Sequence, residues 1–344
     1  MIVGARLSMA ENLWPAADRA LWHESLASSD LFATGGVASR WRFKTVQQAK
    51  YAYARWLQHV NDKSPEAMSM PAAARVTPER VKSYIVELAK TTSAASVAAS
   101  LGHLVLALRA IAHERDWRWI TQLQRRQLAR ATCRDKRPSM VPADQLYGLG
   151  LRLMSGAERN VDVRDDLAYR DGLIIALLAS RPLRRKNLAA IRIGKHAIDS
   201  GEQIRISFEA HEMKGGRPFE FWLPGSLVHC YRRYVDEVRP RFIGASSHDF
   251  LWCSRKGHAL TPDGIYQLIV KRTAEAFGKP VHPHLFRDIA ATAIATDRPD
   301  QVHLAHDLLG HASPEMTERH YLHAQSVKAG NNYGALIREL RLRR

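Results

Sequence analysis

Apolar residues recur at helical spacing through the first third of the chain. From residue 45 to residue 60 they return every three or four positions, which places them on one face of a helix. The same period continues downstream, and it predicts four helices, at residues 45–60, 78–88, 97–111 and 120–131. Thr45 and Gln48 have the spacing of a capping box, and Thr77-Pro78 is typical of a helix start. Residues 1–40 are predicted to hold one shorter helix, around 15–27.

The pattern changes after a polar, basic segment at 134–139, which contains a proline and indicates a linker. Helical spacing resumes at 143–154 and 165–180. Apolar and polar residues then alternate at 204–208 and 219–223, on either side of a turn that contains Gly215-Gly216. Period two around a glycine turn predicts a β-hairpin. A third strand is predicted within 189–198, and helices return after residue 252.

These elements predict a mainly α fold with a small antiparallel β-sheet, in the α+β class. A chain of 344 residues favours two domains, since single cores rarely exceed about 250–300 residues. The predicted division is an N-terminal extension at 1–40, a helical domain at 41–134, a linker at 135–141 and a second domain at 142–344.

Charge narrows the class of partner. The chain has 51 Lys and Arg against 34 Asp and Glu, a net charge of +17. The polar faces of the first helices are rich in Lys and Arg, which favours nucleic acid as the partner over a basic protein without one. Three widely spaced cysteines argue against disulfides or a cysteine zinc site. Without a long apolar run, a cytoplasmic protein without a membrane partner is expected.

Six polar residues of the second domain have side chains suited to phosphoryl transfer. They are Arg184, Lys214, His284, Arg287, His311 and Tyr321. Guanidiniums bind phosphate oxygens in a fixed, bidentate geometry and keep their charge. His284 and Arg287 are three positions apart, so a helix would place them on one face. Arg181 and Arg185 are alternatives to Arg184, and Tyr333 is an alternative to Tyr321.

The order of these residues resembles that of the tyrosine recombinases, the phage-integrase type of site-specific recombinase. The resemblance lies in His284-Leu285-Phe286-Arg287 within 282–292 and in Leu309-Gly310-His311 within 308–317. It covers about 142–324, and it selects Arg184 and Tyr321 from their neighbours. It implies a tyrosine-recombinase catalytic domain at 142–344, preceded by a four-helix, SAM-like core-binding domain that contacts DNA.

The resemblance also implies a mechanism. Tyr321 attacks a phosphodiester and forms a 3′-phosphotyrosine, while Lys214 protonates the leaving 5′ oxygen. Arg184, Arg287 and His311 stabilise the charge that gathers on the non-bridging oxygens. His284 is suited to accept the phenol proton. Because the phosphotyrosine conserves the bond energy, neither ATP nor a metal or other cofactor is expected.

The sequence departs from the family pattern at three positions near this site. Pro182 stands where a glycine is frequent, Asn187 where an acidic residue is common, and Asp288 where a histidine is frequent. None of these changes removes a reacting group. Each changes the support that surrounds one, and support for Arg184 is expected to come from elsewhere.

Two other activities fit the same residues: a DNA-binding relative without catalysis, and a type IB topoisomerase that relaxes supercoils. The complete residue set favours catalysis, and the helical first domain, with the spacing from Leu309-Gly310-His311 to Tyr321, favours recombination over relaxation. A nucleoid-associated protein that recombines or integrates DNA, as in a mobile element, is expected. The expected partners are double-stranded DNA and other copies of the chain, in a tetramer on two DNA sites. The tail at 326–344 is predicted to dock on a neighbouring copy, with a solvated basic tail as the alternative.

Overall fold

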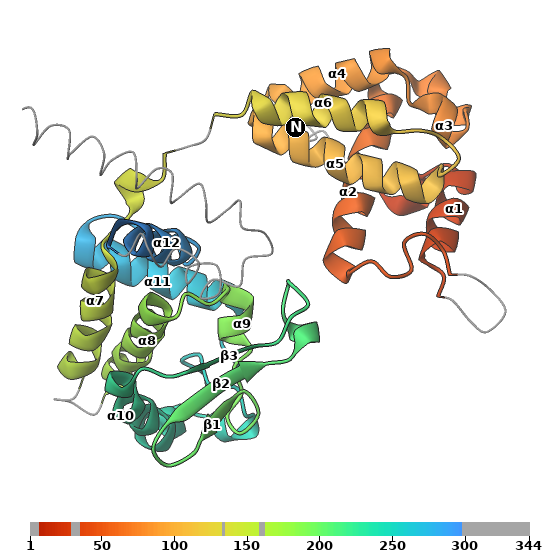
Figure 1. The fold of residues 1–344 in the computed structure, drawn as a ribbon. Helices are drawn as coiled ribbons and strands as arrows, with labels where there is room; N and C mark the ends of the chain where they lie inside the picture. The colour runs from red at the N-terminus through yellow and green to blue at the C-terminus, as the bar shows by residue number, and fades with distance from the viewer. Residues whose placement is uncertain (1–6, 29–34, 133–134, 158–161, 298–344) are drawn as a thin grey trace, which may run out of the picture. The chain divides into compact units, whose positions relative to one another are not determined.

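A computed structural model describes residues 7–28, 35–132, 135–157 and 162–297 of the chain. The chain forms two compact units, residues 1–134 and 135–344. Figure 1 shows the helices and strands of both units, and each unit has its own hydrophobic core.

Unit 1 is helical in its described part. Its helices are α1 (Ala16–Leu26), α2 (Phe43–Lys63), α3 (Ala72–Arg75), α4 (Pro78–Ala89), α5 (Ala94–Ile111) and α6 (Arg118–Ala129), with 3-10 turns at Glu11–Leu13 and Pro65–Ser69. The four helices predicted from the apolar pattern correspond to α2, α4, α5 and α6.

Only one of the two predicted helix starts has the predicted cap. Thr77 precedes α4, and its side chain accepts a hydrogen bond from the backbone N–H of Arg80 at 3.4 Å. The predicted capping box at Thr45 is wrong. Helix α2 begins earlier, at Phe43, and the residue before it, Arg42, forms no side-chain cap. Thr45 therefore lies inside the first helical turn.

Helix α5 lies in the core of unit 1. Half of its 18 residues are buried, and it packs against α1, α2 and α6. By length and composition alone it is the one described helix that could cross a membrane. A core helix of a globular unit has the same composition, because its neighbours cover it on several sides. Trp22 of α1 and Trp56 of α2 are fully buried in the same core, so α1 is an integral part of the unit.

A buried ion pair fastens α1 to the rest of unit 1. The Arg75 guanidinium donates to the Asp18 carboxylate at 2.5 Å, and both side chains are almost fully buried. The Tyr53 hydroxyl donates to the same carboxylate at 2.7 Å. Burial, and then the Asp18 charge, raise the pKa of Tyr53 well above its usual value. Arg75 also donates to backbone carbonyls between α2 and α3, so the cluster joins three segments.

Replacing Asp18 with asparagine should destabilise unit 1 by about 3–5 kcal/mol, because the Arg75 charge would stay buried without its counter-ion. Urea unfolding followed by tryptophan fluorescence measures the loss. Asp116→Asn is the control, since Asp116 pairs with Arg118 at the exposed surface, where such a pair contributes at most about 1 kcal/mol. Equal losses in the two variants would contradict the role given to Asp18.

Unit 2 combines helices with one small sheet. Its elements are α7 (Ala143–Gly156), α8 (Val163–Ser180), α9 (Arg185–Ala189), β1 (Ala197–Asp199), β2 (Ile204–Phe208), β3 (Phe219–Trp222), α10 (Gly225–Arg233), α11 (Pro262–Phe277) and α12 (Leu285–Asp297). Short turns lie at Arg137–Ser139, Ala210–Glu212, Tyr234–Val238, Arg239–Arg241 and Ala245–Ser247. The predicted mainly α fold with a small antiparallel sheet is confirmed.

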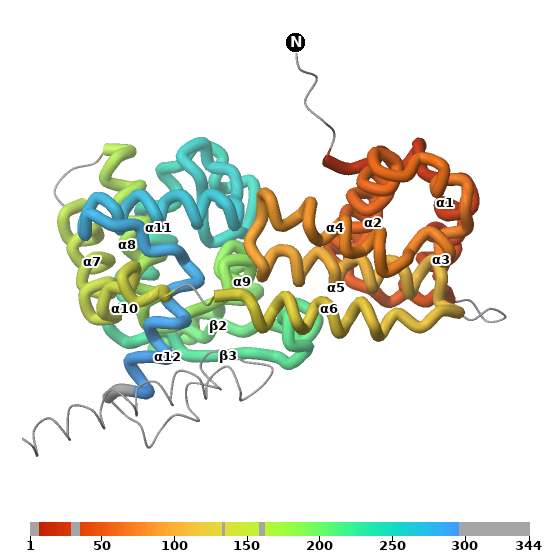
Figure 2. Tube along the Cα trace, turned by 90° about the horizontal axis from the view of Figure 1, so that it is seen from above, coloured from red at the N-terminus to blue at the C-terminus, as the bar shows by residue number. Residues whose placement is uncertain are grey.

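Helix α8 is the central helix of unit 2. It lies beside α7 (Figure 2), and the two backbones approach closely at Gly150 and Gly172. A Cβ atom on either glycine would lie 2.5–2.6 Å from the carbonyl oxygen of the other, so neither position accepts a side chain. On another face, Arg272 of α11 donates to the Asp171 carboxylate of α8 at 2.9 Å. These contacts fix the helix that leads directly to Arg184.

The sheet has the order β1-β2-β3, and both pairings are antiparallel. Phe208 pairs with Phe219 at the last register position before the connection that carries Lys214, so the predicted hairpin is confirmed. The third strand is shorter than predicted. Only Ala197–Asp199 pairs with β2, because α9 and a turn at Gly194, where φ is +75°, occupy the preceding residues.

Candidate active site

Arg184 lies between α8 and α9. Helix α8 ends at Ser180, and Arg184 immediately precedes the first residue of α9. Its carbonyl oxygen accepts the backbone N–H of Leu188, which anchors the residue to the start of this short helix. The side chain is half-buried, and this burial lowers the pKa of its guanidinium.

Arg287 brings a second guanidinium to the same place from α12. Its side chain is buried, with 6% exposure, and its Nη1 donates to the carbonyl oxygen of Pro182 at 2.6 Å. Burial, and then the positive charge of Arg184, lower the pKa of Arg287 to about 10. The side chain therefore stays charged at neutral pH. Pro182 contributes a fixed acceptor, a role that the sequence did not suggest.

His284 lies just before α12 rather than within it. The helix begins at Leu285, and the N–H of Arg287 donates to the His284 carbonyl oxygen across this turn. The prediction that His284 and Arg287 share a helix face is thus wrong in its geometry, although the two residues do lie close together. Partial desolvation lowers the pKa of His284, and the charges of Lys136, Arg287 and Arg184 lower it further against the opposing effect of Asp288. A ring with such a pKa is neutral at pH 7 and can accept a proton.

Asp288 connects this site to the segment that precedes α7. Its carboxylate accepts a hydrogen bond from Lys136 Nζ at 2.8 Å. Lys279 donates to the carbonyl oxygens of Pro138 and Met140 at 3.0 and 2.9 Å. The segment predicted as a linker therefore lies within unit 2 and is bonded to the rest of that unit at two points. Asp288 cannot replace a histidine as a proton donor, but it holds a lysine beside His284.

Lys214 is placed on a separate, exposed turn. The backbone N–H of Gly216 donates to the Met213 carbonyl oxygen at 3.2 Å, which closes a tight turn with Lys214 at its second position. Gly216 has φ of +67°, a conformation that other residues rarely adopt. The structure thus brings Arg184, His284 and Arg287 together and holds Lys214 on the hairpin. His311, Tyr321, Tyr333 and the tail at 326–344 lie outside the described residues.

Glu212 lies two residues before Lys214, and its carboxylate is held by several donors. Lys195 Nζ and His196 Nε2 lie 2.8 and 3.0 Å from its Oε1, and the backbone N–H of Glu209 donates to Oε2 at 3.0 Å. The hydrogen bond from Lys195, helped by those from His196 and Glu209, lowers the pKa of Glu212 to about 2. The carboxylate is therefore ionised throughout the physiological range.

Glu212→Gln should weaken the dependence of stability on acid pH. The folded-state pKa lies below the ordinary value of 4.5, so the contribution of Glu212 is complete above about pH 4.5 and is lost as pH falls toward 2. The wild-type free energy of unfolding should fall more steeply over this range than that of the variant. Urea titrations at pH 5, 4 and 3 measure both slopes. Parallel slopes would show that the carboxylate gains nothing from its donors.

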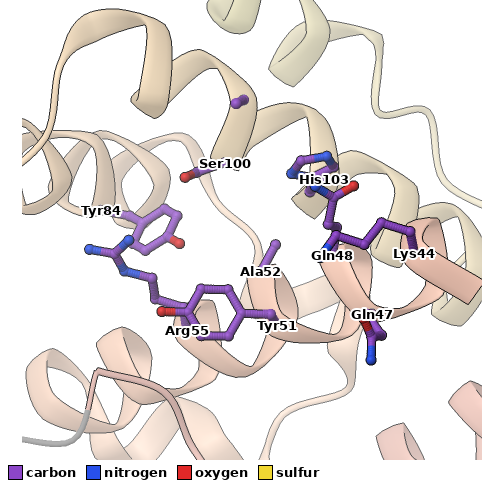
Figure 3. Close-up of a pocket in the computed structure, with 10 residues that line it drawn as sticks. Lys44, Gln47, Gln48, Tyr51, Ala52, Arg55, Tyr84, Ser100 and His103 are labelled. Atoms are coloured by element: carbon purple, nitrogen blue, oxygen red, sulfur yellow. The ribbon is translucent and has the colours of Figure 1, made fainter. Parts of the chain in front are cut away.

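Unit 1 has a polar cleft of about 390 Å³ on the face formed by α2, α4 and α5 (Figure 3). Lys44, Gln48 and His103 gather at one end of it, and Arg55 with Tyr84 at the other. The Tyr84 side chain is 1% exposed, and its hydroxyl has no hydrogen-bond partner among the described residues. Burial raises the pKa of this phenol, so the hydroxyl remains a neutral donor. The cleft therefore offers positive charge and side-chain amides to a ligand.

Comparisons with known proteins bear on the family and the fold of the chain. A model of the phage integrase family matches residues 151–327, about half of the chain. A tyrosine recombinase XerD of Chlorobaculum tepidum is 31% identical over 89 residues, which are 26% of this chain and 29% of that protein. A tyrosine recombinase XerC of Staphylococcus aureus strain bovine RF122 / ET3-1 is 29% identical over 183 residues, 52% of this chain and 57% of that protein. The matches thus span about half or less of these relatives.

A solved structure shares the fold across nearly the whole chain. The XerH site-specific recombinase, bound to palindromic difH substrate in a post-cleavage complex, aligns with a TM-score of 0.61 at 16% sequence identity. The alignment covers 95% of this chain and 97% of that one. At this identity the likeness establishes the fold alone. It extends through both units, including the helices of unit 1 that the family model does not cover.

Proposed function

The chain belongs to the phage integrase family of tyrosine recombinases, and on that premise we propose that it cuts and rejoins DNA at specific sites through a covalent 3′-phosphotyrosine at Tyr321. In this proposal Arg184 and Arg287 bind the phosphate. His284 accepts the proton of the nucleophile, and Lys214 donates a proton to the leaving group. His311 and Tyr321 complete the set. The relatives named above are themselves called tyrosine recombinases.

One observation carries this proposal: the guanidiniums of Arg184 and Arg287 lie close enough to influence each other's charge, in a partly buried place near the His284 imidazole. Neighbouring buried like charges repel each other, as the lowered pKa of Arg287 indicates. An anion between them removes that cost. A phosphodiester in its transition state is such an anion, because charge builds on its non-bridging oxygens. The site is therefore more favourable to the transition state than to the empty protein.

The chemical step follows from the same groups. The Tyr321 oxygen attacks phosphorus and transfers its proton to His284, whose lowered pKa leaves the ring nitrogen free to accept it. The bond from phosphorus to the 5′ oxygen breaks, and Lys214 supplies the proton that this oxygen needs. Rejoining reverses both transfers. The phosphotyrosine conserves the energy of the original bond, so no nucleotide hydrolysis enters the cycle.

Unit 1 would bind the duplex through its cleft. Lys44 and Arg55 can neutralise phosphates, while Gln48 can read a base edge. The XerH structure is described as a complex with its difH substrate, and we extend that kind of partner to this chain. The net charge of +17 agrees with a large phosphate-binding surface.

The function is tested with the wild-type protein and the DNA that flanks its gene. Plasmids carrying two copies of a flanking segment are incubated with the protein without metal or ATP. Recombination predicts deletion or inversion of the DNA between the copies, at one reproducible junction. Relaxation of plasmids without those segments would support a type IB topoisomerase instead, and retarded but uncut DNA would support an inactive DNA-binding relative.

We further propose that four copies assemble on two DNA sites through the tail at 326–344. Deleting that tail should weaken cooperative binding to a two-site DNA at least tenfold and leave binding to a single half-site within about twofold, because avidity is lost while each DNA contact remains. Gel-shift titrations on half-site and full-site duplexes measure both. Equal losses on the two DNAs would indicate a tail that contacts only its own DNA.

A further inference from the structure

We propose that Asn187 and Glu212 are positioning residues that hold the Lys214 turn at a fixed place relative to Arg184. This inference rests on the proposed function, because it assumes that Lys214 delivers the leaving-group proton. It concerns two residues that bond to other parts of unit 2, and it explains how a turn on the sheet can act together with the guanidiniums of Arg184 and Arg287.

Asn187 joins the Arg184 helix to the base of the turn. It is the third residue of α9, the helix that Arg184 precedes, and its side chain is buried with 6% exposure. Its Nδ2 donates to the carbonyl oxygen of Glu212 at 3.3 Å and lies 3.2 Å from Met213 Sδ. Both acceptors come directly before Lys214. The amide therefore bonds the backbone from which the turn starts.

An amide is required for this contact. A carboxylate at position 187 has no N–H to donate, and its charge would face a carbonyl oxygen inside the protein. Asparagine, which stands where the family commonly has an acidic residue, thus suits the particular backbone that lies opposite α9 in this chain.

Glu212 ties the same backbone to a second segment, through its own side chain. Its carboxylate is bonded to Lys195 and His196, in the loop that precedes β1. His196 is buried, its Nδ1 accepts the backbone N–H of Arg192, and its carbonyl oxygen accepts the N–H of Ser207 in β2. With Nδ1 occupied as an acceptor, Nε2 carries the proton that is donated to Glu212. The base of the turn is therefore tied to the sheet as well as to α9.

The turn itself is free beyond this anchored base. Met213 is buried in the core of unit 2, whereas residues 214–218 are exposed. A Cβ added at Gly215 or Gly216 would meet no atom within 4 Å. Lys214 can thus swing over a short arc while its starting point stays fixed. A displacement of about 1 Å at a reacting group can cost about 10²-fold in rate, so such an anchor has a measurable effect.

The test compares two leaving groups on one suicide substrate. In the normal DNA, the phosphorus–oxygen bond breaks and the 5′ oxygen takes a proton from Lys214. In a matched DNA with sulfur at that bridging position, the phosphorus–sulfur bond breaks and a thiolate leaves without a proton, because thiols ionise near pH 8.5. Sulfur therefore restores the cleavage rate of a variant that is defective only in proton delivery. It does not restore the rate of a variant that is defective in the phosphate clamp, which is the pair of guanidiniums of Arg184 and Arg287.

Asn187→Asp and Glu212→Gln should each slow single-turnover cleavage of the oxygen substrate about 10–100-fold and cleave the sulfur substrate within about threefold of wild type. Lys214→Ala is the reference for a repaired defect, and Arg184→Lys is the reference for an unrepaired one. Equal slowing on both substrates, or no slowing on either, would overturn the positioning role. A wild type that cleaves neither substrate would instead refute the proposed function.

Amide hydrogen exchange gives a readout independent of catalysis, and the amides of α8 serve as its control for a general folding defect. Exchange at residues 212–217 should be at least tenfold faster in Asn187→Asp and in Glu212→Gln than in wild type, while exchange within α8 stays unchanged. Glu212→Gln preserves the volume of a partly exposed side chain, so it tests the idea even if the change at the buried Asn187 disturbs the fold. Unchanged exchange in the turn in both variants would count against the anchor.

Discussion

Tyr321→Phe should abolish the covalent protein–DNA adduct. The phenol oxygen is the only atom of that side chain that can attack phosphorus, and phenylalanine removes that oxygen while preserving the ring. A suicide substrate nicked near the cleavage site traps the adduct, which denaturing gel electrophoresis separates from free protein. The wild type should convert most of the substrate, and the variant none within the detection limit, a loss of at least 10³-fold.

Tyr333→Phe is the matched control, because it makes the same change twelve residues further along the chain. It should form adduct at a rate close to wild type, and both variants should bind the DNA with wild-type affinity. If Tyr321→Phe formed an adduct, or if only Tyr333→Phe lost the adduct, a residue other than Tyr321 would be the nucleophile. If Tyr321→Phe also lost DNA binding, its missing adduct would report a folding defect and not the loss of the nucleophile.

The helices and the hairpin could be predicted from sequence because local patterns determine them. Apolar residues at three- and four-residue spacing form a buried face in α2, α4 and α5, and alternation around Gly215-Gly216 gives the register from Phe208 to Phe219. The start of α2 could not be predicted, since Thr45 has the right residue type for a cap but the helix continues through it. Spacing shows where a helix can form, and tertiary packing determines where it begins.

The candidate residues of the site could be predicted, and most of their surroundings could not. Residue type and the family resemblance select Arg184, His284 and Arg287, and the structure places the three within electrostatic reach of one another. The acceptor for Arg287 is a backbone carbonyl of Pro182, which any residue could have supplied, so no letter of the sequence reveals it. Asn187 was recognised only as a missing charge. Its hydrogen bond to the Glu212 carbonyl joins residues 25 positions apart, and that pairing depends on the fold.

The buried cluster of unit 1 shows the same limit. Asp18 and Arg75 are 57 positions apart, and the sequence around each is typical of a charged residue at a protein surface. Nothing in the local pattern distinguishes them from surface charges such as Asp116 and Arg118. Their pairing follows from where α1 packs, so α1, within the segment predicted as an extension, contributes one partner of a buried ion pair to the core.

Arg287→Gln should slow single-turnover cleavage by about 10³–10⁵-fold, the range for loss of an arginine that stabilises a phosphoryl-transfer transition state. Glutamine can still donate a hydrogen bond toward Pro182, but it has no charge to offer the phosphate. Sulfur at the leaving position should not restore the rate, because the defect lies in the clamp. Rapid-quench assays at saturating protein measure the chemical step separately from DNA binding.

The same variant should be more stable than wild type in the absence of DNA, by about 1 kcal/mol or more. Burial, and then the Arg184 charge, disfavour the charged form of Arg287, as its pKa of about 10 against 12.5 indicates. This cost is present in the folded protein at every pH below about 10, and it diminishes as pH rises from there toward 12.5. Removing the charge removes the cost, which urea unfolding at pH 7 measures.

Arg272→Gln should show the reverse pattern. Arg272 pairs with the buried carboxylate of Asp171, so the variant should lose stability and retain the cleavage rate of its folded fraction. Arg287→Gln should gain stability and lose activity, whereas Arg272→Gln should lose stability and keep its activity. This contrast distinguishes a phosphate site from a structural ion pair. If Arg287→Gln lost stability as Arg272→Gln does, Arg287 would be a structural residue and the phosphate clamp would need another partner for Arg184.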